Sequence, residues 1–329
     1  MAEEQRASYG GQAVIEGVMI RGKDRVATAC RNHAGEIIVH HEAITTATTK
    51  YPFLKWPFLR GTPALIDSFS LGYRTLMWSA DIAMEGEEEQ AKPTPLQYFL
   101  TIATALAFGI GVFVLLPTLM TKFIPGAHHF EATGTIWQQL LPTPGRILPN
   151  IAEGIIRLLF LVAYILIIGN NKEIKRVFSY HGAEHKVVNS YEMGAPLTVE
   201  GARPYSRIHP RCGTSFLFLF FVVGILHALI GWPGNVGIRM LSRIIMIPLI
   251  AGVSYELLRL AGRYRDSLLL KIMVWPGMAL QQLTTAEPTD DQIEVALKSM
   301  KTVLEDEGVL APEVVEAMTA DEENDNALT

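Results

Sequence analysis

Four apolar stretches constrain the fold of this 329-residue chain more than any other feature. They cover residues 96–120, 151–169, 215–232 and 237–258. Each approaches or exceeds the roughly 20 residues that a helix needs to cross a bilayer. Since 49% of all residues are also hydrophobic, the sequence predicts a membrane protein. The fourth stretch is interrupted by Arg239, Arg243 and Glu256, so a buried amphipathic helix is the alternative interpretation there.

The basic residues indicate how these stretches are oriented. Loop 170–214 contains a run of lysines and arginines, whereas loop 121–150 contains only Lys122 and Arg146. By the positive-inside rule, loop 170–214 lies in the cytoplasm, and four spans then place both termini there. Arg239 and Arg243, at the outer end of the fourth stretch, run against this scheme. The sequence therefore predicts a multi-pass protein of the cytoplasmic membrane.

Polar segments flank the spans and divide the chain into three parts. Residues 1–95 are predicted to form a cytoplasmic α+β module, and 96–258 a membrane domain of about four transmembrane helices. Residues 259–329 are predicted to form an interfacial segment, a cytoplasmic amphipathic helix and an acidic disordered tail. The acidic tail disfavours nucleic acid as a partner.

The N-terminal module contains a predicted hairpin. Its β-rich runs at 25–33 and 36–44 are separated by Ala34-Gly35. The preceding residues 9–22 contain four glycines, which allow a backbone to approach a ligand or another segment closely. They predict either a bulged first strand or a direct ligand contact. An amphipathic helix is expected to open at Pro63.

Two further elements are predicted after the fourth stretch. Residues 268–283 are apolar but contain Pro276-Gly277, which favours an interfacial or re-entrant segment over a span. Thr289, followed three residues later by Gln292, predicts the start of a soluble helix over 289–304.

The polar loop 170–214 contains the strongest chemical motif, His181-Gly182-Ala183-Glu184-His185. Residues 172–193 are predicted to form one helix that ends at Gly194. Residues four apart on a helix share a face, so His181 and His185 provide the first half of a zinc site. The H-x-x-E-H spacing is that of the inverted zincins, in which the glutamate is the general base. Glu184 is therefore the candidate catalytic residue.

Other residues must complete such a site. Glu192 projects on the histidine face, but it lies about 10 Å along the helix axis from His185. His209 and Cys212, before the third stretch, are ligand types that zinc accepts. Four ligands would make a closed structural site, and three with a water a catalytic one; the sequence leaves both open. Cys30, the other cysteine of the chain, is also predicted to be cytoplasmic, and a cytoplasmic location disfavours a disulfide.

The second stretch contains a possible ion pair. Glu153 and Arg157 lie four residues apart near its start. They predict either a polar path between helices or a simple pair near the outer interface.

The chain resembles the YqhQ-like family of bacterial multi-pass membrane proteins, a family of unknown function. The resemblance rests on residues 10–19, 57–61, 181–186 and 209–214 and extends from residue 9 to about residue 304. It implies a membrane protein that is described as a predicted metal-dependent enzyme, and it implies no particular substrate.

Three readings follow. The preferred one is a zinc-dependent hydrolase at the cytoplasmic membrane surface, with a peptide segment or a lipid head group as its substrate. The alternative is a non-enzymatic scaffold or transport component, in which a structural zinc site holds the loop and other parts bind a protein partner. In the third, the histidines form hydrogen bonds without metal. The sequence predicts no particular substrate or oligomeric state.

Overall fold

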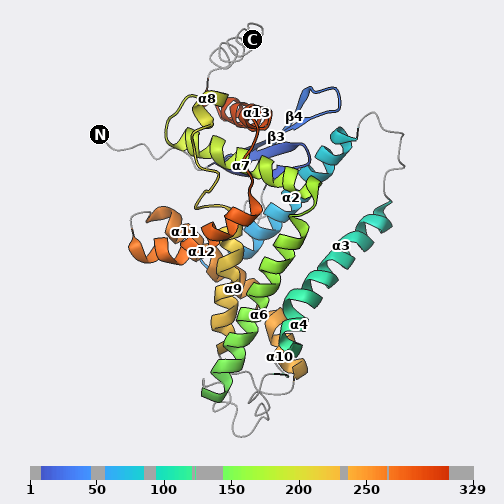
Figure 1. The fold of residues 1–329 in the computed structure, drawn as a ribbon, viewed down its shortest axis with the longest axis vertical. Coiled ribbons are helices and arrows are strands. Elements are labelled where there is room, and N and C mark those ends of the chain that lie inside the picture. The colour runs from blue at the N-terminus through green and yellow to red at the C-terminus, as the bar shows by residue number, and fades with distance from the viewer. Residues whose placement is uncertain are drawn as a thin grey trace.

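A computed structural model describes residues 9–45, 56–84, 94–120, 123, 144–229, 236–264 and 267–310. The chain is mostly helical, with a small four-stranded antiparallel sheet near its N-terminus. The sheet and the helices around it form a head, from which longer helices extend in one direction (Figure 1). Most of loop 121–150, and the acidic tail that follows residue 310, lie outside the described residues.

The sheet is a simple antiparallel meander. Its strands lie in the order β1 (Gly10–Val14), β2 (Gly17–Arg21), β3 (Arg25–Arg31) and β4 (Ile37–Ala43). The predicted hairpin of β3 and β4 is confirmed. The glycine-rich segment, expected to be one strand with a bulge, is instead two paired strands. They are joined by a tight turn in which Glu16 has a positive φ of 52°.

Helices cover both faces of the sheet. One face packs against α7 (Lys172–Glu192) and α13 (Asp290–Asp306), and Val18 and Ile20 of β2 lie in that core. On the other face, Met19 packs near Leu71 of α2 (Gly61–Ala83). This division follows from the alternation of side chains along a strand. The N-terminal, central and C-terminal parts of the chain therefore meet in one head.

The helices predicted at the two ends of the chain are present. The amphipathic helix expected at Pro63 is α2, which begins at Gly61. The helix expected after Thr289 is α13, and Thr289 and Gln292 form its capping box. Helix α7 also ends as predicted, with Gly194 at a φ of 76° just beyond it.

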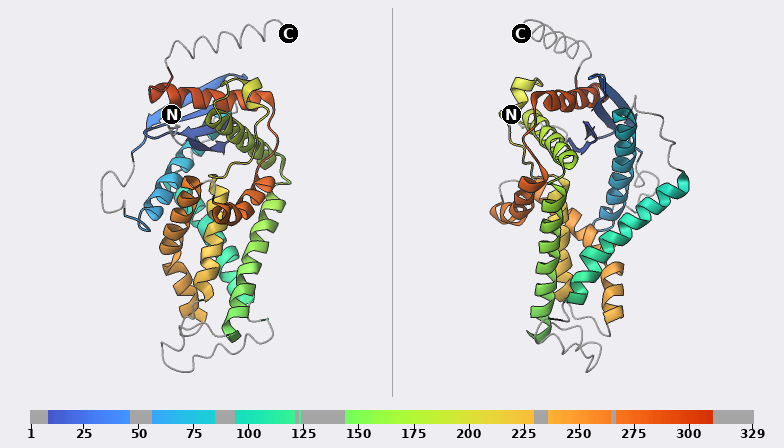
Figure 2. Two further views of the ribbon diagram at one scale, coloured as in Figure 1. Left: turned by 90° about the vertical axis from the view of Figure 1, so that its left-hand side faces the viewer. Right: turned by 45° about the vertical axis from the view of Figure 1, so that its right-hand side comes forward.

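Of the remaining helices, the short α8 (Val199–Ala202) lies in the head, and the others form the elongated part of the molecule and its junction with the head (Figure 1, Figure 2). These others are α3 (Pro95–Ile110), η2 (Gly111–Leu115), α4 (Leu116–Met120), α6 (Pro144–Ile168), α9 (Gly213–Leu229), α10 (Val236–Ile245), α11 (Ile247–Arg263) and α12 (Leu268–Thr284). Helix α12 passes through Pro276 without ending and packs against α9 and α11.

Two helical stretches of the described chain are long and apolar enough to cross a membrane, residues 99–120 and 151–168. The third predicted span corresponds to α9, whose apolar part, residues 213–226, is shorter. The fourth prediction, a single span over 237–258, is wrong because α10 and α11 are separate helices. Proline lacks a backbone N–H and favours the first turn of a helix, so Pro248 starts α11 rather than continuing α10.

Candidate metal centre

Helix α7 presents the histidine motif at the centre of the molecule. The Asn171 side chain caps its first turn by accepting a hydrogen bond from the Glu173 N–H at 2.8 Å. The helix is anchored on β1, β2 and α13, which buries the middle of it. His185 and Glu184 are only 2% and 3% exposed, so the motif faces the protein interior rather than bulk water.

Both histidines of the motif are held by backbone carbonyls. Nδ1 of His181 lies 2.9 Å from the Thr284 oxygen, and Nδ1 of His185 lies 2.7 Å from the Arg207 oxygen. A carbonyl oxygen only accepts hydrogen bonds, so each Nδ1 must donate, and each neutral ring then has its lone pair on Nε2. Metal-binding histidines in proteins are oriented in the same way.

Cys212 completes a group of three. Its Sγ lies 3.2 Å from Nε2 of His181, and ligand atoms of His181, His185 and Cys212 all lie within 4.8 Å of one another. Zinc–nitrogen bonds of about 2.0–2.1 Å and zinc–sulfur bonds of about 2.3 Å would require only small adjustments of these three side chains. The Thr214 hydroxyl donates to Cys212 Sγ at 3.4 Å and helps to fix the position of the sulfur. Two imidazoles and one thiolate thus form a donor set that fits zinc and leaves a fourth position open.

Glu184 lies beside this group. Its Oε2 is 3.4 Å from Nε2 of His185, on the side of the ring that would face a metal ion. Its side chain passes directly over strand β1, where a Cβ at Gly11 would lie 3.2 Å from Glu184 Cγ and 2.0 Å from the Met19 oxygen. The glycine-rich segment therefore has a packing role, because it lets β1 approach the carboxylate of the motif.

Two predicted ligands lie outside the group. Nε2 of His209 faces the Glu192 carboxylate at 3.7 Å, and Glu192 also forms an ion pair with Arg211. The His209 backbone is fixed by Gln281 of α12, whose side chain exchanges two hydrogen bonds of 2.8 Å with it. The structure therefore brings together His181, His185 and Cys212, and places His209 and Glu192 next to them as a separate polar contact.

Glu16, in the turn between β1 and β2, approaches the same helix at another point. It forms an ion pair with Arg176 and accepts a hydrogen bond from the Tyr180 hydroxyl at 3.3 Å. The β1–β2 turn does fold back onto α7, but its carboxylate binds the first half of that helix instead of the motif.

The segment after α12 supports the centre in a way that the sequence analysis missed. Besides the Thr284 carbonyl, Ala286 packs so closely on α7 that a Cβ at Gly182 would lie 2.1 Å from the Ala286 oxygen. The Ala286 N–H also donates to the Phe178 carbonyl at 2.8 Å. Gly182, inside the motif, is thus the position that lets this segment reach His181. In the sequence, the only indication of this contact is the group of polar residues within 281–285, at the end of the apolar run 268–283.

The two cysteines are expected to differ sharply in reactivity. Cys30 is fully buried under α2, and this burial raises the pKa of its thiol to about 12, so almost no thiolate is present at pH 8. Cys212 is partly exposed. After treatment with a chelator, so that no zinc ion covers Cys212, a maleimide should therefore label one thiol per native chain and two per denatured chain, as counted by mass spectrometry. Cys212→Ser should abolish native labelling; rapid native labelling of Cys30 would contradict the burial of this residue.

The fold and site together define a class: a mostly helical protein with a sheet-containing head and a buried His/His/Cys cluster on its central helix. The chain belongs to the family described as "Protein of unknown function (DUF1385)", whose model matches residues 56–306. It is also 37% identical over 311 residues to the "Uncharacterized protein YqhQ" of Bacillus subtilis (strain 168), covering 90% of this chain and 92% of that protein. The family resemblance expected from the sequence is confirmed. No solved structure matches the chain.

Proposed function

We propose that this protein is a zinc-dependent hydrolase that acts at the cytoplasmic surface of the cell membrane. One observation carries the proposal: two imidazoles are fixed through Nδ1 by backbone carbonyls, and their ligand atoms lie within 4.8 Å of one another and of a cysteine sulfur. A buried carboxylate lies beside them. This arrangement suits a zinc ion with one position left for water.

The chemistry divides among the residues of the centre. His181, His185 and Cys212 would hold the ion. A bound zinc ion supplies Lewis acidity and lowers the pKa of water toward neutrality. Glu184 accepts the proton of the attacking water and later returns it to the leaving group. The carbonyls of Thr284 and Arg207 keep the two rings in the required tautomer.

The proposed membrane location rests on composition and shape. The two long apolar stretches and the apolar helix α9 lie in the elongated part of the molecule, and the basic loop 170–214 lies largely in the head (Figure 1). A multi-pass arrangement with the head in the cytoplasm accommodates both features. The lipid bilayer is then a partner of the helices, and the centre lies close to the membrane surface.

The second candidate is a scaffold or transport component in which zinc is structural. It is favoured by the polar contacts of Glu153, which meets Arg157 and Arg243 among apolar helices. Buried charge of this kind often marks a transport path. A structural zinc, however, usually has four protein ligands, and His209 faces Glu192 instead of the centre.

Metal analysis tests whether the centre exists. Detergent-purified protein is expected to contain about one zinc per chain, as in single-ion protein sites. His185→Ala should remove most of it, measured by elemental analysis. His41→Ala is the matched control, because His41 is exposed on β4 and paired with Asp306. Wild-type protein that holds no zinc after reconstitution would overturn the hydrolase proposal and favour histidines that only form hydrogen bonds.

A further inference from the structure

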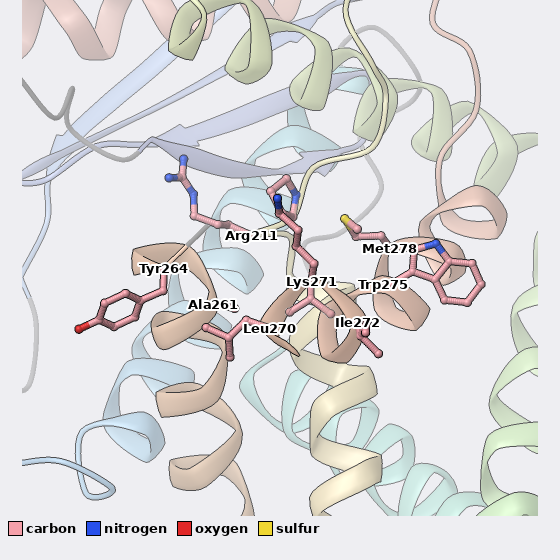
Figure 3. A pocket seen from close by; sticks show the side chains of 10 residues that line it. Arg211, Ala261, Tyr264, Leu270, Lys271, Ile272, Trp275 and Met278 are labelled. Carbon is pink, nitrogen blue, oxygen red and sulfur yellow. The ribbon is translucent and has the colours of Figure 1, made fainter. Parts of the chain in front are cut away.

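A cavity of about 560 Å³ lies where the head meets the elongated helices. Its wall is formed by the loop before Cys212, the end of α11 and the first half of α12 (Figure 3). Most of the lining is apolar: Ala261, Leu270, Ile272, Val274, Trp275 and Met278. Its volume falls within the roughly 300–1,000 Å³ of typical small-molecule sites.

The polar groups of this cavity are basic. Arg211 and Lys271 extend from its wall toward the sheet, on the side of the head (Figure 3). In the sequence, residues 257–284 contain four basic residues, Arg259, Arg263, Arg265 and Lys271, and one acidic residue, Asp266. The cavity thus combines an apolar interior with two basic side chains, Lys271 and Arg211, of which Arg211 also pairs with Glu192. This combination complements an anionic amphiphile.

The surface around the cavity is apolar as well. Leu268, Leu269, Ile272 and Trp275 at the start of α12 are all more than half exposed. The start of α12 projects sideways at the level where the elongated helices leave the head (Figure 1). Exposed apolar side chains, an aromatic ring and basic residues at one level are typical of a segment that lies in a membrane interface.

We infer that this cavity binds an anionic phospholipid, with an acyl chain against α12 and the phosphate near Lys271 and Arg211. The inference rests on the membrane location proposed above but not on the zinc site. Because Arg211 directly precedes Cys212, a lipid held in this way has its head group beside the loop that contributes to the metal centre. An anionic phospholipid is thereby the substrate class that best fits the proposed hydrolase.

Native mass spectrometry of the full-length protein tests the inference with phosphatidylglycerol and phosphatidylcholine as probes. Phosphatidylglycerol should bind more tightly, and Lys271→Glu should weaken it by about tenfold or more, since each basic residue near an anionic lipid surface contributes about 1 kcal/mol. Lys298→Glu on α13 is the matched control, because Lys298 is exposed in the head, away from the cavity. Ala261→Trp should fill the cavity and weaken both lipids.

The remaining outcomes are distinct. His185→Ala should bind phosphatidylglycerol as the wild type does, so a missing zinc site leaves the inference intact. Equal binding of the two lipids that is unaffected by Lys271→Glu and by Ala261→Trp would overturn it. Displacement of the lipid by glycerol phosphate would identify a site for free phosphate esters, and displacement by an apolar peptide a site for a protein segment; either result also overturns it.

Discussion

Replacement of Glu184 by glutamine is expected to leave the zinc content unchanged and to slow hydrolysis by about 10²–10⁴-fold, the usual contribution of a general base. Glutamine has nearly the same volume, so the contact with Gly11 is kept, but its amide cannot accept the proton of water. Zinc-loaded protein would be incubated with phosphatidylglycerol vesicles and with a library of membrane-protein peptides. Products would be followed by mass spectrometry, and zinc by elemental analysis.

The control is Glu173→Gln, which removes an exposed carboxylate from the first turn of the same helix. It should retain both zinc and activity. If Glu184→Gln loses zinc, the carboxylate is a metal ligand rather than a base. If wild type and variant hold zinc and neither yields a product from either substrate set, the scaffold or transport role is favoured. Equal rates in the two proteins would show that Glu184 does not act as the base.

The local part of the centre could be predicted from the sequence, and its tertiary part only incompletely. Two histidines four residues apart share a helix face wherever the helix lies. Cys212 lies 31 residues from His181 and was only one of several possible ligands. Which of these candidates joins the two histidines depends on Gln281 of α12. Gln281 lies 72 residues after His209 and holds the His209 backbone through two hydrogen bonds. No local pattern encodes that contact.

The same distinction applies to the fold. The hairpin of β3 and β4 has a glycine in its turn and was predictable, whereas β1 and β2 are joined through Glu16, a residue that rarely adopts a positive φ. Its carboxylate binds Arg176, 160 residues away, so a distant contact supports the turn. Hydropathy predicted the fourth span because it averages over a window. Pro248, in the first turn of α11, marks a break between two helices at one position within that window.

The ion pair predicted between Glu153 and Arg157 exists, but it is part of a larger buried network. The Glu153 side chain is only 1% exposed, and it also lies 3.4 Å from Arg243 of α10. The Thr118 hydroxyl at the end of the first long apolar stretch donates to it at 2.9 Å. In the sequence, Arg243 interrupted the fourth apolar stretch and ran against its predicted orientation. The structure gives it a role, because one carboxylate compensates two buried guanidinium groups.

Glu153→Ala is therefore expected to destabilise the protein by about 3–5 kcal/mol, the usual cost of removing one partner from a buried ion pair. Arg157 and Arg243 would lose their shared counter-charge among apolar helices, where water cannot replace it. At about 2–4 °C per kcal/mol for a domain of 150–250 residues, the thermal midpoint should fall by about 10 °C. The midpoint would be measured in detergent by circular dichroism.

Glu200→Ala provides the matched control, since Glu200 is an exposed glutamate in α8 of the head, and its midpoint should stay within about 1 °C of wild type. A further comparison separates charge from packing. Glu153→Gln keeps the side-chain volume and an oxygen acceptor for Thr118, so a loss of stability close to that of Glu153→Ala means that the charge dominates. If neither substitution at Glu153 lowers the midpoint, the carboxylate does not compensate the two arginines, and these helices are stabilised by apolar packing alone.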